Sequence, residues 1–227
     1  MSVRSALMLV TCLAIAGCQT AQMKVDPSLS AVAPLSVVGA NPRVWNSQIS
    51  FGPWATSEVR EGLTWGFGYR LLGVEARYAS QPYRIVVASG DARMQGECIT
   101  RALALSRKGL TVDPAFGMMP ALSCGFTGMG EGTLRLKTTA SNAEKGEIVF
   151  GTDRWTIRSI NEFAGSPIRS TEPAGYEFSY DDQVVAAVET INHGRVWISP
   201  ALSREEQARI AALATVLLLY DPAETGE

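Results

Sequence analysis

The chain has 227 residues, of which 46% are hydrophobic, and its 20 basic and 22 acidic residues leave a formal net charge of −2. A chain of this length fits one domain with a short additional segment. Because the charges nearly balance and no basic block occurs, the sequence does not support a nucleic-acid partner. The 21 glycines and 11 prolines indicate many tight turns, and therefore favour short strands over long helices.

The first residues are typical of a secretory signal. Arg4 is the only charge among the first five residues, residues 6–15 are almost wholly apolar, and small residues follow. This apolar run is too short for a membrane-spanning helix, which needs about 20 apolar residues. We therefore expect residues 1–17 to be a lipoprotein signal peptide that the mature protein lacks.

The last four residues of this zone, Ile15-Ala16-Gly17-Cys18, resemble the lipobox of bacterial lipoproteins. The resemblance implies that signal peptidase II recognises Ile15, Ala16 and Gly17 and cuts before Cys18, whose thiol carries diacylglycerol. Enterobacterial lipoproteins retained at the inner membrane carry Asp where this chain has Gln19. The resemblance therefore favours the periplasmic face of the outer membrane, with two or three acyl chains as a stable anchor. An ordinary secretory signal with a chance cysteine is the alternative.

Residues 19–40 contain many small residues, two prolines and no clear hydrophobic period. We expect residues 18–43 to form a lipid-anchored tether, with a short strand within residues 35–39. Residues 44–227 are then expected to form a single β-rich periplasmic domain.

An aromatic stripe follows early in this domain. In "WGFGY" the rings of Trp65, Phe67 and Tyr69 alternate with glycines. This period of two predicts a strand with all three rings on one face. We expect that face to belong to the core, because aromatic stripes usually serve packing. Stacking on the sugar rings of peptidoglycan is the alternative.

Two cysteines remain for the folded domain, because Cys12 leaves with the signal and Cys18 takes the lipid. In an oxidising periplasm Cys98 and Cys124 are expected to form a disulfide, which would stabilise the fold by about 3–4 kcal/mol on the chain-entropy model. Two free buried thiols are the alternative. Since the chain has no Cys-x-x-Cys and a single histidine, we expect neither a metal site nor a cofactor.

Hydrophobic alternation and turn residues predict antiparallel strands from residue 83 onward. The clearest series is strand, turn, strand, turn, strand, with turns at Asp181-Asp182 and at residues 192–194. The expected strands lie at residues 83–89, 133–139, 147–150, 154–160, 175–180, 183–191 and 195–199.

The chain ends in a predicted helix. Ser203 and Glu206 form a capping box, so the helix should run from Arg204 to about Tyr220. Its 11 residues from Ile210 to Tyr220 are apolar on all sides except for one threonine, and at ~1.5 Å per residue they are too short to span a membrane. Such a helix must be enclosed by protein. We therefore expect a β-rich α+β fold, in which a curved antiparallel sheet or barrel packs around a buried apolar C-terminal helix.

The hairpin "GYEFSYDDQVVAAVETI" and the helix "RIAALATVLLLYD" are similar to the end of the tubby-like fold. In that fold, seen in tubby and scramblase-type proteins, a β-barrel closes around an apolar C-terminal helix. The resemblance covers about the last 50 residues, concerns the fold alone and transfers no function.

Common catalytic motifs for hydrolases, metalloproteases and phosphate-binding loops do not occur in the sequence. The single His193 lies in a predicted turn, and a carboxylate pair for glycan cleavage would have to come from Glu172, Glu177, Asp181 and Asp182. We expect a lipoprotein that is not an enzyme and that binds or scaffolds another envelope component, an envelope protein or the cell wall. A carrier of a lipophilic ligand is the alternative, although the terminal helix would fill its cavity. A hydrolase acting on cell-wall glycan or lipid is a third candidate.

Overall fold

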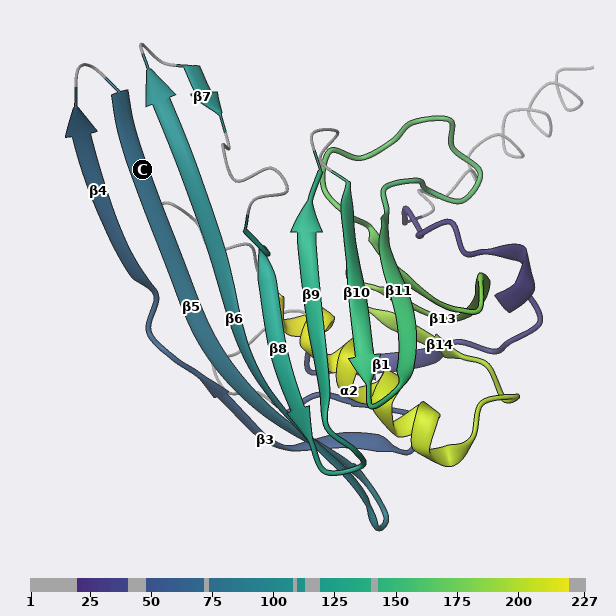
Figure 1. Ribbon diagram of the computed structural model, residues 1–227. Helices are drawn as coiled ribbons and strands as arrows, with labels where there is room; N and C mark the ends of the chain where they lie inside the picture. The colour runs from purple at the N-terminus through teal and green to yellow at the C-terminus, as the bar shows by residue number, and fades with distance from the viewer. Residues whose placement is uncertain are drawn as a thin grey trace, which may run out of the picture.

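The computed structural model describes residues 20–40, 48–71, 74–107, 110–112, 119–139 and 143–220. Over these residues the chain forms fourteen strands, one short 3-10 helix and one α-helix (Figure 1). The strands are β1 (Leu35–Val38), β2 (Ser50–Phe51), β3 (Trp54–Glu61), β4 (Trp65–Leu71), β5 (Val74–Ser89), β6 (Ala92–Arg107), β7 (Leu110–Val112), β8 (Leu122–Thr127), β9 (Gly132–Thr138), β10 (Glu144–Phe150), β11 (Asp153–Ile160), β12 (Gly175–Tyr180), β13 (Gln183–Glu189) and β14 (Arg195–Ile198). The helices are η2 (Pro27–Leu29) and α2 (Arg204–Leu219).

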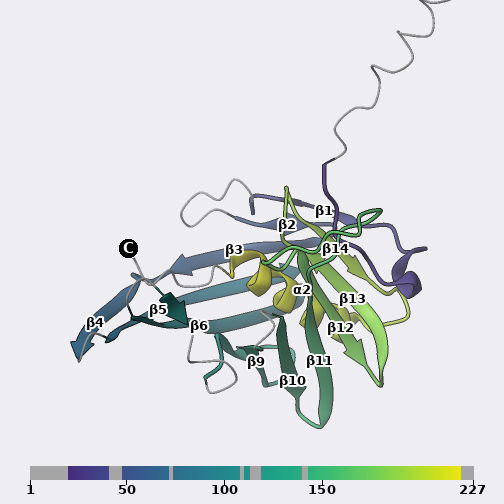
Figure 2. The same cartoon turned by 90° about the horizontal axis from the view of Figure 1, so that it is seen from above.

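Twelve of the strands close into an antiparallel barrel. Their order around the wall is β5, β3, β2, β1, β14, β13, β12, β11, β10, β9, β8 and β6, and β6 pairs with β5 to complete the ring. The remaining strands, β4 and β7, lie at the two edges of the sheet. Figure 2 shows the barrel from above with α2 in the middle. The expected antiparallel sheet around a C-terminal helix is therefore confirmed, and it takes the form of a closed barrel.

The strands predicted from alternation and turn chemistry are present. In β9, Leu134 and Leu136 point into the core and are fully buried, while their neighbours are exposed. The two predicted hairpin turns are made by residues with positive φ: Asp181 and Asp182 between β12 and β13, and Asn192 before β14. The register of β12, β13 and β14 follows from these short turns.

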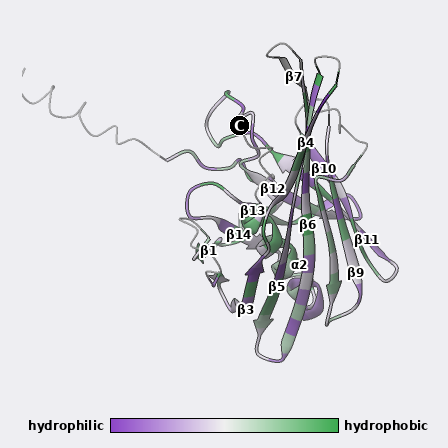
Figure 3. Ribbon diagram, turned by 90° about the vertical axis from the view of Figure 1, so that its left-hand side faces the viewer, coloured by the Kyte–Doolittle hydropathy of each residue, from purple (hydrophilic) through white to green (hydrophobic). Residues whose placement is uncertain are grey.

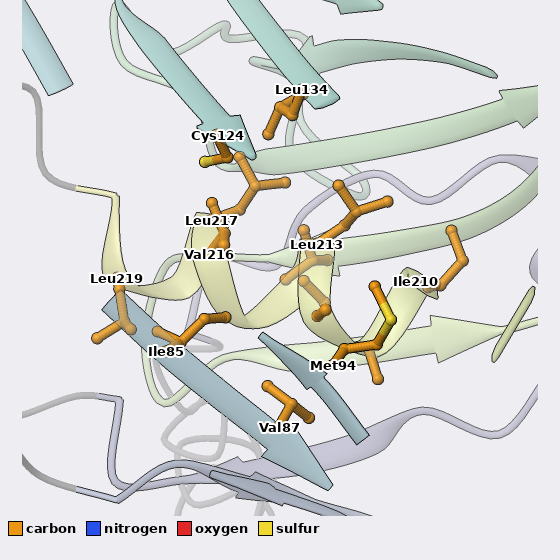
Figure 4. Close-up of a cluster of buried hydrophobic side chains, with 14 of the residues drawn as sticks. Ile85, Val87, Met94, Cys124, Leu134, Ile210, Leu213, Val216, Leu217 and Leu219 are labelled. Atoms are coloured by element: carbon orange, nitrogen blue, oxygen red, sulfur yellow. The ribbon is translucent and has the colours of Figure 1, made fainter. Parts of the chain in front are cut away.

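α2 lies inside the barrel, and this position explains its all-round apolar sequence. Leu213, Val216 and Leu217 are almost fully buried and share one core cluster with wall residues such as Ile85 (Figure 4). The Tyr83 hydroxyl donates a hydrogen bond of 3.2 Å from the wall to the carbonyl oxygen of Val216. The predicted capping box is present at the start of the helix. Over the described ranges, no helix has the length and apolar character needed to cross a membrane.

Residues 20–40 belong to the folded domain, which differs from the expected tether. Met23 and Leu29 are each 1% exposed and pack with Ala187 and Trp197, which lie on the outer side of β13 and β14. β1, the expected short strand, is a full member of the barrel wall between β14 and β2. The segment showed no period because it packs through isolated side chains on an irregular backbone. Such contacts leave no repeating pattern in a sequence.

Candidate interaction surface

β5 and β6 are much longer than the barrel wall. β3 pairs with β5 only as far as Tyr83, and β8 pairs with β6 only as far as Thr100. Beyond these points β5 and β6 continue together past the end of the barrel, where β5 pairs with β4 and β6 pairs with β7. We call this four-stranded sheet the extension; it consists of β4, residues 74–80 of β5, residues 101–107 of β6, and β7 (Figure 1).

One face of the extension is apolar and open to solvent. Trp65, Phe67, Tyr69 and Leu71 on β4 are 72%, 68%, 63% and 57% exposed. The rings of Phe67 and Tyr78 lie on the same face, with centroids 5.2 Å apart. By register this face, which we call the aromatic face, also includes Val74, Ala76, Leu103 and Leu105. At its barrel end, beside Trp65, it includes the polar residues Ser80 and Arg101.

The expectation that the aromatic stripe belongs to the core is wrong, although the strand and its alternation are confirmed. β4 pairs with β5 only beyond the end of the barrel, so its rings lie outside the space that α2 fills. The sequence pattern fixes which residues share a face, but it does not say whether that face meets protein. An exposed apolar patch of this kind marks an interaction surface far more often than a scattered surface residue does.

The opposite face of the extension is polar or small. Arg70 and Arg77 each place a nitrogen 2.6 Å from a Glu75 carboxylate oxygen, so one carboxylate bridges two guanidinium groups. Hydrogen bonds from Arg70, and then from Arg77, hold the pKa of Glu75 below its usual range. Figure 3 shows the hydropathy alternating along β6. The other members of this polar face by register are Gly66, Gly68, Ala79, Ala102, Ala104 and Ser106.

The apolar side of the sheet changes between barrel and extension. Tyr83 and Ile85 on β5 point into the barrel core, and continuing their alternation places Ala79 and Arg77, not Tyr78, on the same side. The same change occurs on β6. Cys98 points into the core, and Leu103, five residues further on, therefore lies on the outer side of the sheet. The aromatic face therefore continues the outer wall of the barrel, and the barrel core does not extend beneath it.

A groove of about 970 Å³ lies on the outer wall, starting at the base of the extension. Gly125 lies in its floor, and a Cβ built there would meet nothing within 4 Å. Arg84 lines the groove and donates a hydrogen bond of 2.8 Å to the side-chain oxygen of Gln95, which also lines it. Pro82 and Ile99 give the upper part of the groove apolar character. The groove and the aromatic face together form one mixed surface on the same side of the sheet.

His193 lies in a different cavity, of about 630 Å³, close to the first described residue, Thr20. Glu189 lines the same cavity and its side chain is 2% exposed, 2.7 Å from the Arg195 guanidinium. The Met23 N–H also donates to Glu189, at 2.8 Å. Through this hydrogen bond and this ion pair, Glu189 holds the N-terminal segment against the barrel wall.

The carboxylates considered for glycan cleavage are not gathered at one point. Glu177 is buried on β12, where Arg158 lies 2.6 Å from its carboxylate and the Asp26 N–H donates to it at 3.0 Å. Burial raises the pKa of Glu177, while the Arg158 charge opposes that rise. Asp181 and Asp182 lie in the turn that follows β12. Glu177 thus serves, like Glu189, to hold the N-terminal segment.

A further buried carboxylate, which no sequence motif singles out, is Glu144 at the start of β10. It is 6% exposed and accepts hydrogen bonds from the Tyr176 hydroxyl at 2.6 Å and from the Tyr220 hydroxyl at 2.9 Å. Burial raises the pKa of Glu144, and both burial and the nearby carboxylate raise the pKa of Tyr176 well above its usual value. The cluster ties the end of α2 to β10 and β12.

Cys98 and Cys124 form a disulfide, as expected, between directly paired positions on β6 and β8. Both residues are buried in the core beside α2, which indicates a structural bond. The lipobox, Ile15, Ala16, Gly17 and Cys18, lies outside the described residues. Within the described part of the chain, no three His, Cys, Asp or Glu side chains lie close enough together to hold a metal ion.

The fold and its surface define a class of protein: a closed β-barrel filled by its own helix, with an amphipathic sheet projecting from one end. No protein-family model, curated protein or solved structure matches this chain. The lipoprotein and tubby-like resemblances therefore remain predictions from the sequence. What the surface can do must be argued from its geometry.

Proposed function

We propose that this protein is a lipid-anchored lipoprotein of the cell envelope that acts by binding, with the extension as its contact element. The observation that carries the proposal is the aromatic face, where Trp65, Phe67 and Tyr69 are each more than 60% exposed on a regular strand. Exposing this much apolar surface to water is unfavourable, at roughly 25 cal/mol per Å². A surface of this kind is typical of a binding site.

The position of the N-terminal segment supports an anchor at Cys18. The described chain begins at Thr20, and Met23 is buried against the barrel beside Phe163 and Gly175. Only four residues would therefore separate the acylated Cys18 from the buried Met23. The proposed lipid would hold the domain directly at the periplasmic face of the outer membrane.

The barrel interior supports binding on the outside over storage of a ligand within. Ile210, Leu213 and Leu217 of α2 are 1% exposed or less and fill the space that a lipophilic ligand would need. The exposed apolar surface and the groove at Gly125 both lie on the outer wall. A partner, the membrane or the cell wall would therefore be contacted from outside.

The anchor is tested by replacing Cys18 with alanine in the producing bacterium. We expect the Cys18→Ala precursor to remain uncut and to lose labelling by radioactive palmitate. Cys12→Ala is the matched control, because it removes a cysteine from the same signal without touching the lipobox. Normal processing and labelling of Cys18→Ala would refute the anchor.

The contact element is tested by photocrosslinking in intact cells. A photoreactive amino acid at Tyr69 should give reproducible adducts, whereas the same group at Asp91 should give none. Asp91 is an exposed residue in the turn that joins β5 to β6, at the far end of the same two strands. Equal adducts at both positions, or none at either, would contradict a binding role for the extension.

A further inference from the structure

We infer that the extension enters the lipid bilayer as one segment of a sheet shared by several copies of this chain, with its aromatic face toward the lipid. This inference rests on the proposed lipid anchor and names what the extension contacts. It follows from the pattern of the two faces, the length of the strands, their position on the barrel, and the outer edges of β4 and β7, which pair with no strand of the described part of the chain.

The pattern of the faces matches a sheet between lipid and a polar interior. Strands that cross a membrane alternate apolar residues toward lipid with polar or small residues toward the lumen. β4 follows this rule residue by residue, with Trp65, Phe67 and Tyr69 on one face and Gly66 and Gly68 on the other. Trp and Tyr also suit the lipid–water interface, because their rings are apolar and carry one polar group.

The extension is long enough to enter the apolar layer of a membrane. β4 has seven residues, paired one to one with residues 74–80 of β5. At about 3.3 Å per residue the strand is roughly 23 Å long. Strands that cross a membrane completely have about 9–11 residues and tilt by about 45°. β4 therefore reaches into the apolar layer but is shorter than a full crossing.

The extension projects from the same end of the barrel as the N-terminal segment. One end of the barrel wall is marked, in the register of the sheet, by Ile160, Gly175 and Glu189. Met23 packs against Gly175 and Glu189 at this end. Thr100 marks the same end on β6, where the extension begins. Figure 1 shows the purple start of the described chain on this side of the barrel. Acyl chains on Cys18 would therefore hold the extension against the same bilayer.

The polar face and the edges require further copies of the chain. The Arg70–Glu75–Arg77 cluster is costly in hydrocarbon, and so are the peptide groups along the outer edges of β4 and β7. Pairing of β4 of one copy with the three residues of β7 of the next would satisfy the peptide groups that face each other there, and polar faces that enclose water would keep the charged cluster out of hydrocarbon. β4 and β7 run in opposite directions, since three antiparallel pairings separate them. An antiparallel sheet can therefore continue across each junction between copies.

The test uses the full lipidated chain in vesicles of phosphatidylcholine and phosphatidylglycerol. Single cysteines labelled with an environment-sensitive fluorophore are placed at Phe67 and Tyr69 on the aromatic face, at Gly68 on the polar face, and at Asp91 as a distant control. We expect a blue shift and strong quenching by spin-labelled lipid at Phe67 and Tyr69, and neither change at Gly68 or Asp91. Equal signals at Phe67 and Gly68 would overturn the inference. The inference would also be overturned if the emission of the fluorophore at Phe67 were already fully blue-shifted without lipid, because protein would then bury this position.

Contact between copies is tested with the Gly68→Cys/Thr111→Cys variant and a flexible bismaleimide crosslinker. A ladder of covalent oligomers is expected in vesicles, while either single variant should give dimers at most. Monomers alone would overturn the shared sheet. Flotation of the vesicles separates the two proposals. If the protein floats with the vesicles through its Cys18 lipid but Phe67 and Gly68 do not differ in fluorescence, the anchor is supported and bilayer entry by the extension is refuted. If the protein does not float with the vesicles, the anchor itself is refuted.

Discussion

The rings of Phe67 and Tyr78 lie 5.2 Å apart across β4 and β5, on the side of the sheet that continues the outer wall of the barrel. Five residues further along β5, Tyr83 points to the other side and donates a hydrogen bond to α2. One uninterrupted strand therefore serves two environments, a packed core and an open aromatic face. The change of side occurs near Pro82, where the barrel wall ends.

We predict that the aromatic face contributes little to folding stability. Phe67→Ala should change the free energy of unfolding by less than about 1 kcal/mol, because the ring is already 68% exposed. Leu213→Ala, at a fully buried position on α2, should cost about 2–5 kcal/mol. Urea unfolding of both variants measures the difference. A large loss in Phe67→Ala would mean that the extension is part of the cooperative core.

The Cys98–Cys124 disulfide should stabilise the domain substantially. It spans 26 residues, for which the chain-entropy model gives about 3–4 kcal/mol. A Cys98→Ala/Cys124→Ala variant should lose roughly this amount, and reduction of the wild-type protein should have the same effect. The variant itself should be insensitive to reductant, which serves as the control. If the wild-type protein unfolds identically with and without reductant, the bond has no such role.

Glu144 should make stability depend on pH. Burial raises its pKa in the folded state, so folding favours the protonated carboxyl. The stability from this preference is fully present below the ordinary carboxyl pKa and is lost as the pH rises through the raised value. Glu144→Gln keeps a neutral side chain, so its stability relative to wild type should increase from acidic to neutral pH. Urea unfolding across that range tests this; a constant difference would contradict it.

The floor of the outer groove should accept a side chain. Gly125→Val should leave stability unchanged or raise it by up to about 1 kcal/mol, because a Cβ there meets nothing and valine suits a strand. Gly146→Val is the matched comparison on β10, where a Cβ would lie 2.3 Å from the Arg135 carbonyl oxygen. Thermal melts should therefore separate the two variants clearly. Similar losses in both would mean that Gly125 is not at an open surface.

Local chemistry was enough to predict the C-terminal part of the fold. The capping box at Ser203 and Glu206 and the turn at Asp181-Asp182 act within a few residues, so the sequence displays them directly. The apolar sequence of the helix also predicts that the sheet encloses it, because a short helix with no polar face can only be stable inside protein. A closed barrel satisfies that need on every side of α2.

The extension could not be predicted from local signals. Alternation in "WGFGY" correctly grouped Trp65, Phe67 and Tyr69, but their exposure depends on where β4 pairs along β5. That register is set by the length of the barrel wall, which is a property of the whole sheet. Once the register is known, the sequence of β5 shows where the environment changes: Tyr78 lies on the outer side of the sheet, whereas Tyr83 and Ile85 lie on the core side.

The buried Glu144 cluster was hidden for a related reason. Glu144 meets Tyr176 and Tyr220, which lie 32 and 76 residues away in the chain. No spacing rule connects such positions before the topology is known. The packing of Met23 against the barrel is similarly long-range, since its partner Glu189 is 166 residues away.

The most direct measurement is hydrogen exchange of the β4 amides in anchored protein on vesicles. We expect the peptide spanning residues 63–71 to exchange at least about tenfold more slowly in the wild type than in Phe67→Asp, which corresponds to ~1.4 kcal/mol of added local stability. Residues of β3 within the barrel wall should exchange equally in both proteins. Bilayer entry and edge pairing by neighbouring copies both predict this protection. Equally fast exchange of β4 in both vesicle-bound proteins would contradict a membrane role for the extension.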